Sequence, residues 1–280
     1  MSVKHVNGAD LYYDEYGSGD RYIFSGMMCH SRISEWTIDL SKHGFHVINV
    51  TIRGYGKSSH VTEDLGNKWY DVWADDICAL ADELGVKRFI YTGWSHGAGI
   101  GWTIARRHPE RVTALLTIAG GPHKKDGQQT GDARRQTIEA AYDERLWEKR
   151  ALQMAELDYP DLPQPTRETE AIRKVCFEED HELLKNMTIE ERIIDPRKPF
   201  PHIDTEEELI SELSEIDIPV LMIGGALDPI STPDVMIRTC NAIKGSKLII
   251  YQDCSHPVAN MRQAEVVKDM LQFCRDRDLI

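Results

Sequence analysis

One serine of the chain lies between two glycines, in a pattern that could expose a nucleophile. The segment Gly93-Trp94-Ser95-His96-Gly97 follows a β-prone run at residues 88–92 and precedes a helix-compatible run at 97–107. A serine in a sharp strand-to-helix turn has a strained backbone, so small flanking residues are needed, and its hydroxyl stands clear of the sheet. We therefore predict that Ser95 is a catalytic nucleophile at the N-terminus of a helix.

A serine hydroxyl is a weak nucleophile at neutral pH, so it needs a base and a carboxylate that orients the base. Asp228 comes just after a strand-like run at 219–223, and His256 comes just after the next one at 247–251. The order serine, acid, histidine predicts that Ser95, Asp228 and His256 act together. Asp253 is a second candidate for the acid, but its position before the loop favours Asp228.

Alternating strand-like and helix-like segments must position these side chains. The strand-like segments are residues 11–16, 22–25, 46–50, 88–92, 112–119, 219–223 and 247–251, and the helix-like segments are 69–84, 97–107 and 261–274. Such alternation predicts a mostly parallel sheet covered by helices. Asn7-Gly8 predicts a hairpin that gives the sheet an antiparallel start.

The strand pattern stops after Gly120-Gly121-Pro122, and the following residues are charged and helix-prone with several prolines. We interpret residues 123–213 as an inserted helical cap. Residues 1–122 and 214–280 would then form the core.

Composition limits the partners of this 280-residue chain. Its formal net charge of −13 argues against nucleic acid or an anionic membrane as the main partner, and favours a small-molecule substrate. The N-terminal residues carry no signal-peptide pattern, and no segment has the apolar length that spans a bilayer, so we expect a cytoplasmic protein. Six cysteines are scattered without paired spacing, which predicts neither a disulfide framework nor a metal site. A homodimer is compatible with these features.

Together, four motifs resemble the α/β-hydrolase superfamily over nearly the entire chain. They are Ser25-Gly26-Met27, the turn Arg53-Gly54-Tyr55-Gly56-Lys57-Ser58, the segment around Ser95, and the loops that carry Asp228 and His256. The resemblance implies an α/β-hydrolase fold, with a mostly parallel eight-stranded sheet flanked by helices and a helical cap between the sixth and seventh strands.

The resemblance also implies an oxyanion hole made by the backbone amides of Met27 and His96. The sequence has Ser25-Gly26 where the family commonly has His-Gly, and the loop that follows is slightly longer, so Met28 is an alternative donor. Arg53 is expected to have a structural role, because a turn arginine often binds neighbouring carbonyl groups.

We expect a serine hydrolase that cleaves a carboxylic ester or lactone through an acyl-enzyme on Ser95, without a metal or organic cofactor. Met28, His30 and Trp94 are the candidate substrate-binding residues. Apolar residues of the cap would complete a pocket for a small, largely apolar substrate, or else form the core of the cap itself; they are Leu146, Trp147, Leu152 and Met154.

Other functions remain open on the same scaffold. Carbon–carbon bond hydrolysis and hydroxynitrile lysis could use the same three residues, and a non-catalytic ligand receptor could retain them. Met28-Cys29-His30 and Ser95-His96-Gly97 faintly resemble the motifs of cofactor-independent ring-cleaving dioxygenases. Those enzymes place an aspartate after the sixth strand, where this chain has Gly120 and Gly121.

Overall fold

The computed structural model describes residues 2–28 and 35–280, and in this part of the chain eight strands form one sheet. The strands are β1 (Ser2–Val6), β2 (Ala9–Tyr16), β3 (Tyr22–Met27), β4 (His46–Thr51), β5 (Phe89–Trp94), β6 (Val112–Ile118), β7 (Val220–Gly225) and β8 (Lys247–Tyr251). Their spatial order is β1-β2-β4-β3-β5-β6-β7-β8. From β4 to β8 all neighbours are parallel, whereas β1 and β2 pair antiparallel and β2 is antiparallel to β4.

Asn7 and Gly8 form the predicted turn between β1 and β2. Both have positive φ angles, 49° and 74°, which is the backbone that a tight Asn-Gly hairpin requires. Arg53 ties this hairpin to the rest of the molecule. Its guanidinium donates to the carboxylate of Asp76 and to the carbonyl oxygen of Asn7, so its contacts in the structure are those of a structural residue.

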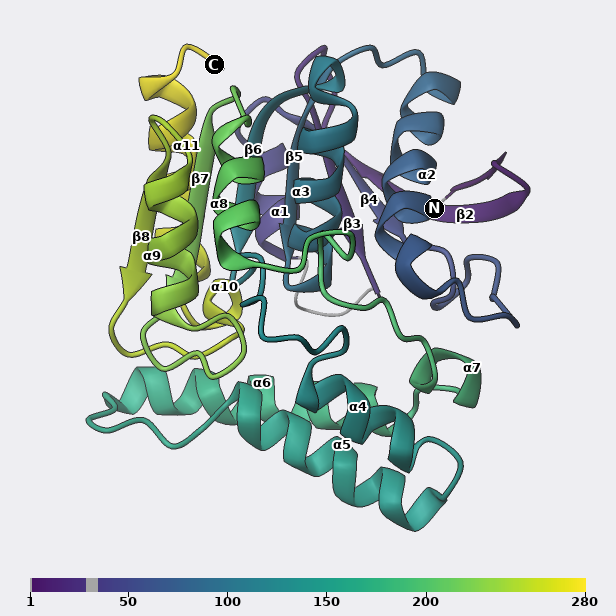
Figure 1. Ribbon diagram of the computed structural model, residues 1–280. Coiled ribbons are helices and arrows are strands. Elements are labelled where there is room, and N and C mark those ends of the chain that lie inside the picture. The colour runs from purple at the N-terminus through teal and green to yellow at the C-terminus, as the bar shows by residue number, and fades with distance from the viewer. Residues whose placement is uncertain (1, 29–34) are drawn as a thin grey trace.

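Helices cover both faces of the sheet (Figure 1). The helices are α1 (Glu35–Ser41), α2 (Trp69–Glu83), α3 (His96–Arg107), α4 (Asp132–Ala140), α5 (Glu144–Asp158), α6 (Arg167–Lys185), α7 (Ile189–Arg192), α8 (Glu206–Ser214), α9 (Pro233–Ala242), α10 (Val258–Met261) and α11 (Gln263–Asp276), with short 3-10 helices η2 (Gly66–Lys68) and η3 (Pro109–Arg111). Successive strand residues point to opposite faces. Leu115 therefore packs in the core that includes α2, α3 and α8, and Leu116 in the core that includes α1 and α11.

Helix α2 shows why a segment of this sequence becomes a sheet-covering helix. Trp69, Trp73, Ile77 and Leu80 recur at intervals of three or four residues and are all almost completely buried. This spacing puts them on one side of a helix, so folding buries a continuous apolar stripe. The ring of Trp73 also donates its N–H to the carbonyl oxygen of Arg53.

The helices α4, α5 and α6 lie across the end of the sheet where β3 and β5 finish (teal in Figure 1). They belong to the predicted insertion at 123–213, and its treatment as a separate cap stays a prediction. Helix α8 also falls within that range, but its Leu209 and Leu213 pack in the core beside the sheet.

The predicted fold class, a mostly parallel eight-stranded sheet with flanking helices, is confirmed. Among the helices in the described ranges, none combines the length and the apolar character needed to cross a membrane.

Candidate active site

Ser95 stands at the turn between β5 and α3. Its φ of 54° and ψ of −113° are strained for a residue with a side chain, as expected for a serine held at such a turn. The flanking glycines are needed for space: a Cβ on Gly93 would overlap the backbone of Gly97, and one on Gly97 would overlap the carbonyl oxygen of Gly26. The sequence pattern around Ser95 is therefore explained by backbone packing.

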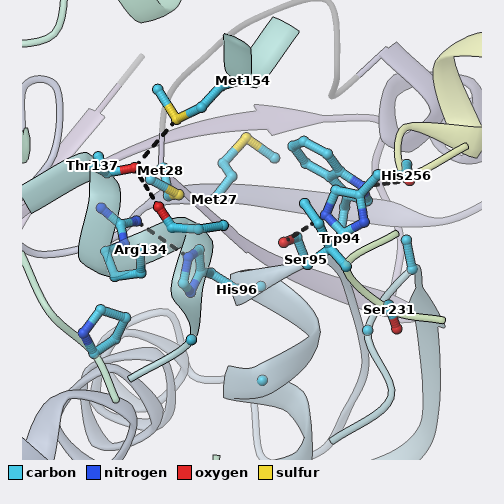
Figure 2. A pocket seen from close by; sticks show the side chains of 18 of the residues that line it. Met27, Met28, Trp94, Ser95, His96, Arg134, Thr137, Met154, Ser231 and His256 are labelled. Carbon is cyan, nitrogen blue, oxygen red and sulfur yellow. Dashed lines mark hydrogen bonds between the residues drawn. The ribbon is translucent and has the colours of Figure 1, made fainter. Parts of the chain in front are cut away.

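The structure brings Ser95, His256 and Asp228 into one hydrogen-bonded line. Ser95 Oγ lies 2.9 Å from His256 Nε2, and His256 Nδ1 lies 2.9 Å from Asp228 Oδ2. The second oxygen of Asp228 accepts the backbone N–H groups of Ile230 at 2.8 Å and Ser231 at 2.9 Å. Figure 2 shows the Ser95 hydroxyl directed at the ring of His256.

These contacts also set the protonation states of His256 and Asp228. Burial is the largest single influence and disfavours the charged imidazolium, but the charge and hydrogen bond of Asp228, together with the charges of Asp158 and Asp180, outweigh it, and the pKa of His256 is raised above its ordinary value. Burial likewise acts to raise the pKa of Asp228. The positive charge of His256 and the hydrogen bonds that the Asp228 carboxylate accepts nevertheless hold this pKa below its usual range. Asp228 is therefore an anion that stabilises a protonated His256.

Two further contacts fix the histidine. The indole N–H of Trp94 donates to the carbonyl oxygen of His256 at 2.9 Å, and the two rings pack with centroids 5.1 Å apart. Asp253, the rival acid, instead forms an ion pair with Arg262. The structure thus places Asp228, and not Asp253, at the imidazole.

The two predicted oxyanion-hole residues lie at the ends of neighbouring elements. Met27 ends β3, and His96 begins α3, where backbone N–H groups have no partner within the helix. The hydroxyl of Tyr91 connects these two segments, because it accepts the N–H of Gly26 at 3.2 Å and donates to the carbonyl oxygen of Gly97 at 3.0 Å. Met28 follows β3 directly and also faces the pocket, so it stays the alternative donor.

A cavity of about 430 Å³ opens above Ser95, between the end of the sheet and α4–α6. Met27, Met28, Trp94, His96 and His256 line it with Ser95. His30, the remaining predicted substrate-binding residue, lies outside the described residues.

Only one of the four apolar residues expected from the insertion reaches this cavity. Met154 lines it, whereas Leu146 and Leu152 are exposed and Trp147 is buried away from it. Met154 therefore agrees with the expected pocket and Trp147 with the alternative of a core position, whereas both expectations are wrong for Leu146 and Leu152. Helix α5 carries all four residues and lines the cavity with polar and apolar side chains alike: Arg150, Met154, Leu157 and Asp158.

Four polar residues of the cavity were missed at the level of sequence. Arg134 of α4 contacts His96 with its Nη2 3.3 Å from the ring Nε2, and Tyr70 of α2 contacts the same ring with its hydroxyl 3.0 Å from Nδ1. Asp158 of α5 and Asp180 of α6 face the cavity from the opposite helices. Helical periodicity alone does not show which face of an inserted helix meets a pocket, so the sequence carried no signal for them.

The pKa values of Asp158 and Asp180 are raised above that of an ordinary aspartate. Burial raises the pKa of Asp158 to about 6 and that of Asp180 to about 7, and the negative charge of Asp158 adds to the effect at Asp180. Oδ2 of Asp180 is buried and has no hydrogen-bond partner in the part of the chain that the structure describes. Both carboxyl groups act electrostatically to raise the pKa of His256.

Within residues 2–28 and 35–280, no cluster of histidine, cysteine and acidic side chains could hold a metal ion. Of the two glycines after β6, where a ring-cleaving dioxygenase has its aspartate, Gly120 has no space for a side chain, because a Cβ there would overlap that of Ala98; a Cβ on Gly121 would only touch neighbouring side chains. The N–H of Gly121 donates to Ser231 Oγ at 3.0 Å, which holds this segment against the loop that carries Asp228.

Comparisons with known proteins agree with this architecture. The model of the α/β hydrolase fold family matches residues 26–168, just over half of the chain. The AB hydrolase superfamily protein YisY of Bacillus subtilis is 26% identical over 97% of both chains. The pimeloyl-[acyl-carrier protein] methyl ester esterase of Vibrio atlanticus is 23% identical over 88% of this chain and 91% of its own.

Among solved structures, the enol-lactonase from Burkholderia xenovorans LB400 superposes with a TM-score of 0.77 at 18% identity, over 98% of this chain and 100% of its own. That similarity concerns the fold, whereas the family model concerns the sequence. With the strand order and the turn at Ser95, the family match leads to one conclusion: the chain belongs to the α/β hydrolase fold family.

Proposed function

We propose that this protein is a serine hydrolase that cleaves a carboxylic ester or lactone through an acyl-enzyme on Ser95. The observation that carries the proposal is the line from Asp228 through His256 to Ser95, with both hydrogen bonds at 2.9 Å, at the floor of the cavity. A nucleophile, a base in contact with it and an acid that orients the base are the groups that acyl transfer needs.

In the first half-reaction Ser95 Oγ attacks the carbonyl carbon while His256 Nε2 takes the hydroxyl proton. The Nδ1–H of His256 donates to Asp228, which fixes the tautomer that leaves Nε2 free to accept. The protonated imidazole then gives this proton to the departing alkoxide, so the ester bond breaks as the alcohol leaves.

The negative charge of the tetrahedral intermediate needs donors that are already in place. The backbone amides of Met27 and His96 supply them in this proposal, with Met28 as the alternative to Met27. The Tyr91 hydroxyl supports this arrangement, since it joins Gly26 to Gly97 and so holds the two donor segments in register.

In the second half-reaction His256 removes a proton from water, the hydroxide attacks the acyl carbon, and Ser95 leaves with a proton from His256. Asp228 remains ionised throughout and stabilises the imidazolium. Apart from the substrate and water, both proposed half-reactions use only side chains and backbone amides of this chain.

The relatives support an ester or lactone as the substrate. One relative is named a methyl ester esterase and another a 3-oxoadipate enol-lactonase, which is 24% identical over 95% of this chain. Ester and lactone hydrolysis differ only in whether the alcohol stays attached to the acyl group, so one site of this kind serves both.

The test is turnover of p-nitrophenyl acetate and butyrate by wild type and Ser95→Ala, with labelling by a fluorophosphonate. We expect Ser95→Ala to lose labelling and at least about a thousandfold in turnover. Ser231→Ala is the matched control, because Ser231 also lines the cavity but contacts only the Asp228 loop and Gly121. Labelling of another residue, with turnover intact in Ser95→Ala, would contradict the proposal.

Carbon–carbon bond hydrolysis and hydroxynitrile lysis require the same three residues and are separated only by their substrates. Tight binding of a ligand without turnover would instead indicate a receptor. The ring-cleaving dioxygenase is disfavoured by the crowding at Gly120. A cytoplasmic location and a homodimer stay predictions.

A further inference from the structure

Arg134 places an uncompensated positive charge against the cavity. One of its terminal nitrogens, Nη2, contacts His96, and the other, Nη1, is buried with no hydrogen-bond partner among the described residues. In the described part of the chain no carboxylate lies within ion-pair distance of this guanidinium. A buried guanidinium nitrogen without an acceptor is costly, because the group has left water and gained no partner.

The contacts of His96 add a second donor beside Arg134. An arginine can only donate, so Nε2 of His96 accepts from it, and the ring proton is on Nδ1. Burial, reinforced by the charge of Arg134, lowers the pKa of His96 well below its ordinary value, so the ring is neutral with one proton. That Nδ1–H donates to the oxygen of Tyr70, 3.0 Å away.

Tyr70 therefore keeps its own hydroxyl proton for another partner. Burial raises the pKa of Tyr70, so the phenol stays protonated at neutral pH. Tyr70 and Arg134 both line the cavity. Both contact His96, the residue that follows the nucleophile, so one charged and one neutral donor lie on the same side of the pocket. Figure 2 shows Arg134 beside His96.

The other charged groups on this side of the cavity are already engaged. Asp195 accepts from Thr130 and forms an ion pair with Arg197. Glu191 accepts the backbone N–H groups of Gly56 and Thr188, both at 2.8 Å. Neither carboxylate is available to Arg134, and within residues 2–28 and 35–280 no acceptor contacts its Nη1, which leaves this donor for a ligand.

The second arginine of the cavity is different. Arg150 donates to Thr137 Oγ1 at 3.3 Å, to Gln136 Oε1 at 3.1 Å and to the carbonyl oxygen of Ala133 at 2.7 Å. Its side chain therefore supports α4, the helix that carries Arg134. This leaves Arg134 as the cation whose donors remain for a ligand.

We propose that Arg134, assisted by Tyr70, binds a carboxylate group of the substrate, so that the natural substrate is an anionic ester or lactone: a half-ester of a dicarboxylic acid or a lactone that bears a free acid. The proposal rests on the proposed function and narrows its substrate class. It also replaces the expectation of a largely apolar substrate.

A carboxylate suits these donors for two reasons. It offers two acceptor oxygens to a planar guanidinium, which makes the pair short and directional. The cavity also shields the pair from water, so the interaction is stronger than at the surface. The apolar residues Met27, Met28 and Met154 lie in the same cavity and suit the hydrocarbon between the acid and the ester.

The test compares charged and neutral esters of the same shape. The substrates are monomethyl succinate, glutarate and adipate, each paired with the methyl ester of its primary amide, and hydrolysis is followed by pH-stat titration. For the best acid of the three, we expect wild type to prefer the anion by at least about tenfold in kcat/KM. Arg134→Gln should reduce this ratio by about 10- to 100-fold, and Tyr70→Phe by about three- to tenfold.

Arg135→Gln is the matched control. Arg135 is the next residue of α4, is exposed, and pairs with Asp132, so its loss should leave the ratio unchanged. A ratio that is the same in wild type and Arg134→Gln would overturn the carboxylate site while ester hydrolysis, and with it the proposed function, still stands.

A binding measurement separates the two proposals completely. Calorimetric titration with free succinate, glutarate and adipate should show binding of at least one dianion to wild type and to Arg135→Gln, weakened at least tenfold in Arg134→Gln. Such binding without hydrolysis of any ester would support the carboxylate site and contradict the proposed function. The carboxylate site is wrong if Arg134→Gln changes neither the binding of any dianion nor the preference for anionic esters.

Discussion

The polar groups on the sheet side of the cavity and those on its helical side differ in how completely they are hydrogen-bonded. On the sheet side, His256 contacts Ser95 and Asp228, and both oxygens of Asp228 have partners. On the helical side, Nη1 of Arg134 and Oδ2 of Asp180 are buried without one. The groups of the proposed reaction are thus positioned before any substrate arrives, whereas Arg134, the proposed carboxylate site, retains a free donor.

This difference follows from where the residues lie. Ser95, Asp228 and His256 stand on loops just after parallel strands, whose ends are fixed relative to one another by the sheet. Arg134 and Asp180 lie on helices that contact the sheet only at its end. A change on the sheet side should therefore act on the rate of reaction, and one on the helical side on specificity or on stability.

The largest effect is expected from Asp228→Asn. Loss of the carboxylate removes the group that orients and stabilises His256, so turnover of p-nitrophenyl butyrate should fall about a thousand- to ten-thousandfold. In wild type the acidic limb of kcat/KM should lie above pH 6.5, because the pKa of His256 is raised and only the neutral imidazole accepts the proton of Ser95. Any residual activity of the variant should have its acidic limb at lower pH.

Asp253→Asn is the matched control for this variant, since Asp253 pairs with Arg262 away from the imidazole. It should change turnover by less than about threefold. Equal losses of turnover in Asp228→Asn and Asp253→Asn would show that Asp228 contributes no more to the reaction than a surface acid does.

Gly97→Ala should damage both stability and rate. The new methyl group would overlap the carbonyl oxygen of Gly26, so the backbone next to the oxyanion-hole residues must move. We expect a loss of about 1–3 kcal/mol in the free energy of unfolding, measured by urea denaturation, and at least about a tenfold loss of kcat.

Gly131→Ala provides the comparison from the helical side. Its φ is −67°, and a Cβ there meets no atom within 4 Å, so the free energy of unfolding should change by less than about 1 kcal/mol. A Gly97→Ala enzyme as stable and active as Gly131→Ala would show that the turn at Ser95 tolerates movement.

Tyr91→Phe tests the link between the two oxyanion-hole segments. The change leaves the N–H of Gly26 and the carbonyl of Gly97 without their shared partner, which should cost about 1–3 kcal/mol of unfolding free energy. The value of kcat should fall about three- to tenfold while the acidic limb of the pH profile stays in place, since His256 is untouched. A shifted limb would show that Tyr91 acts through the base instead.

The smallest effect is expected from Asp180→Asn, and it should appear in stability. The folded protein holds the pKa of Asp180 at about 7, well above that of an unfolded aspartate, so it binds a proton that the unfolded chain releases. The contribution of Asp180 to wild-type stability should therefore fall as pH rises from about 4 through about 7. Relative to wild type, the variant should gain about 1–2 kcal/mol between about pH 5 and about pH 8.5.

Glu178→Gln, an exposed change on the same helix, should show no such dependence on pH. Urea denaturation at the two pH values gives the comparison. If Asp180→Asn tracks wild type at both, the carboxyl group is not held protonated by its surroundings.

The sequence predicted the sheet side of the site much better than the helical side. The glycines around Ser95 and the order of Ser95, Asp228 and His256 reflect backbone constraints at strand ends, which leave a pattern in the residue types. The choice between Asp228 and Asp253 followed from that order, and the structure places Asp228 on His256.

Arg134, Tyr70 and Asp180 left no comparable pattern. Each lies on a helix with many charged or aromatic residues, and only the packing of that helix decides which side chains reach the cavity. For the same reason Leu146 and Leu152 were expected in the pocket but are exposed, and α8 was grouped with the insertion although Leu209 and Leu213 pack in the core.

The most direct test of the account is to trap the acyl-enzyme. Wild type is mixed rapidly with p-nitrophenyl butyrate, quenched in acid during the first turnovers, digested and analysed by mass spectrometry. The account predicts a butyryl group on the peptide that contains Ser95, formed at least as fast as steady-state turnover and absent from Ser95→Ala. Steady turnover with Ser95 unmodified at every time, or a butyryl group on another residue at the same rate, would contradict it.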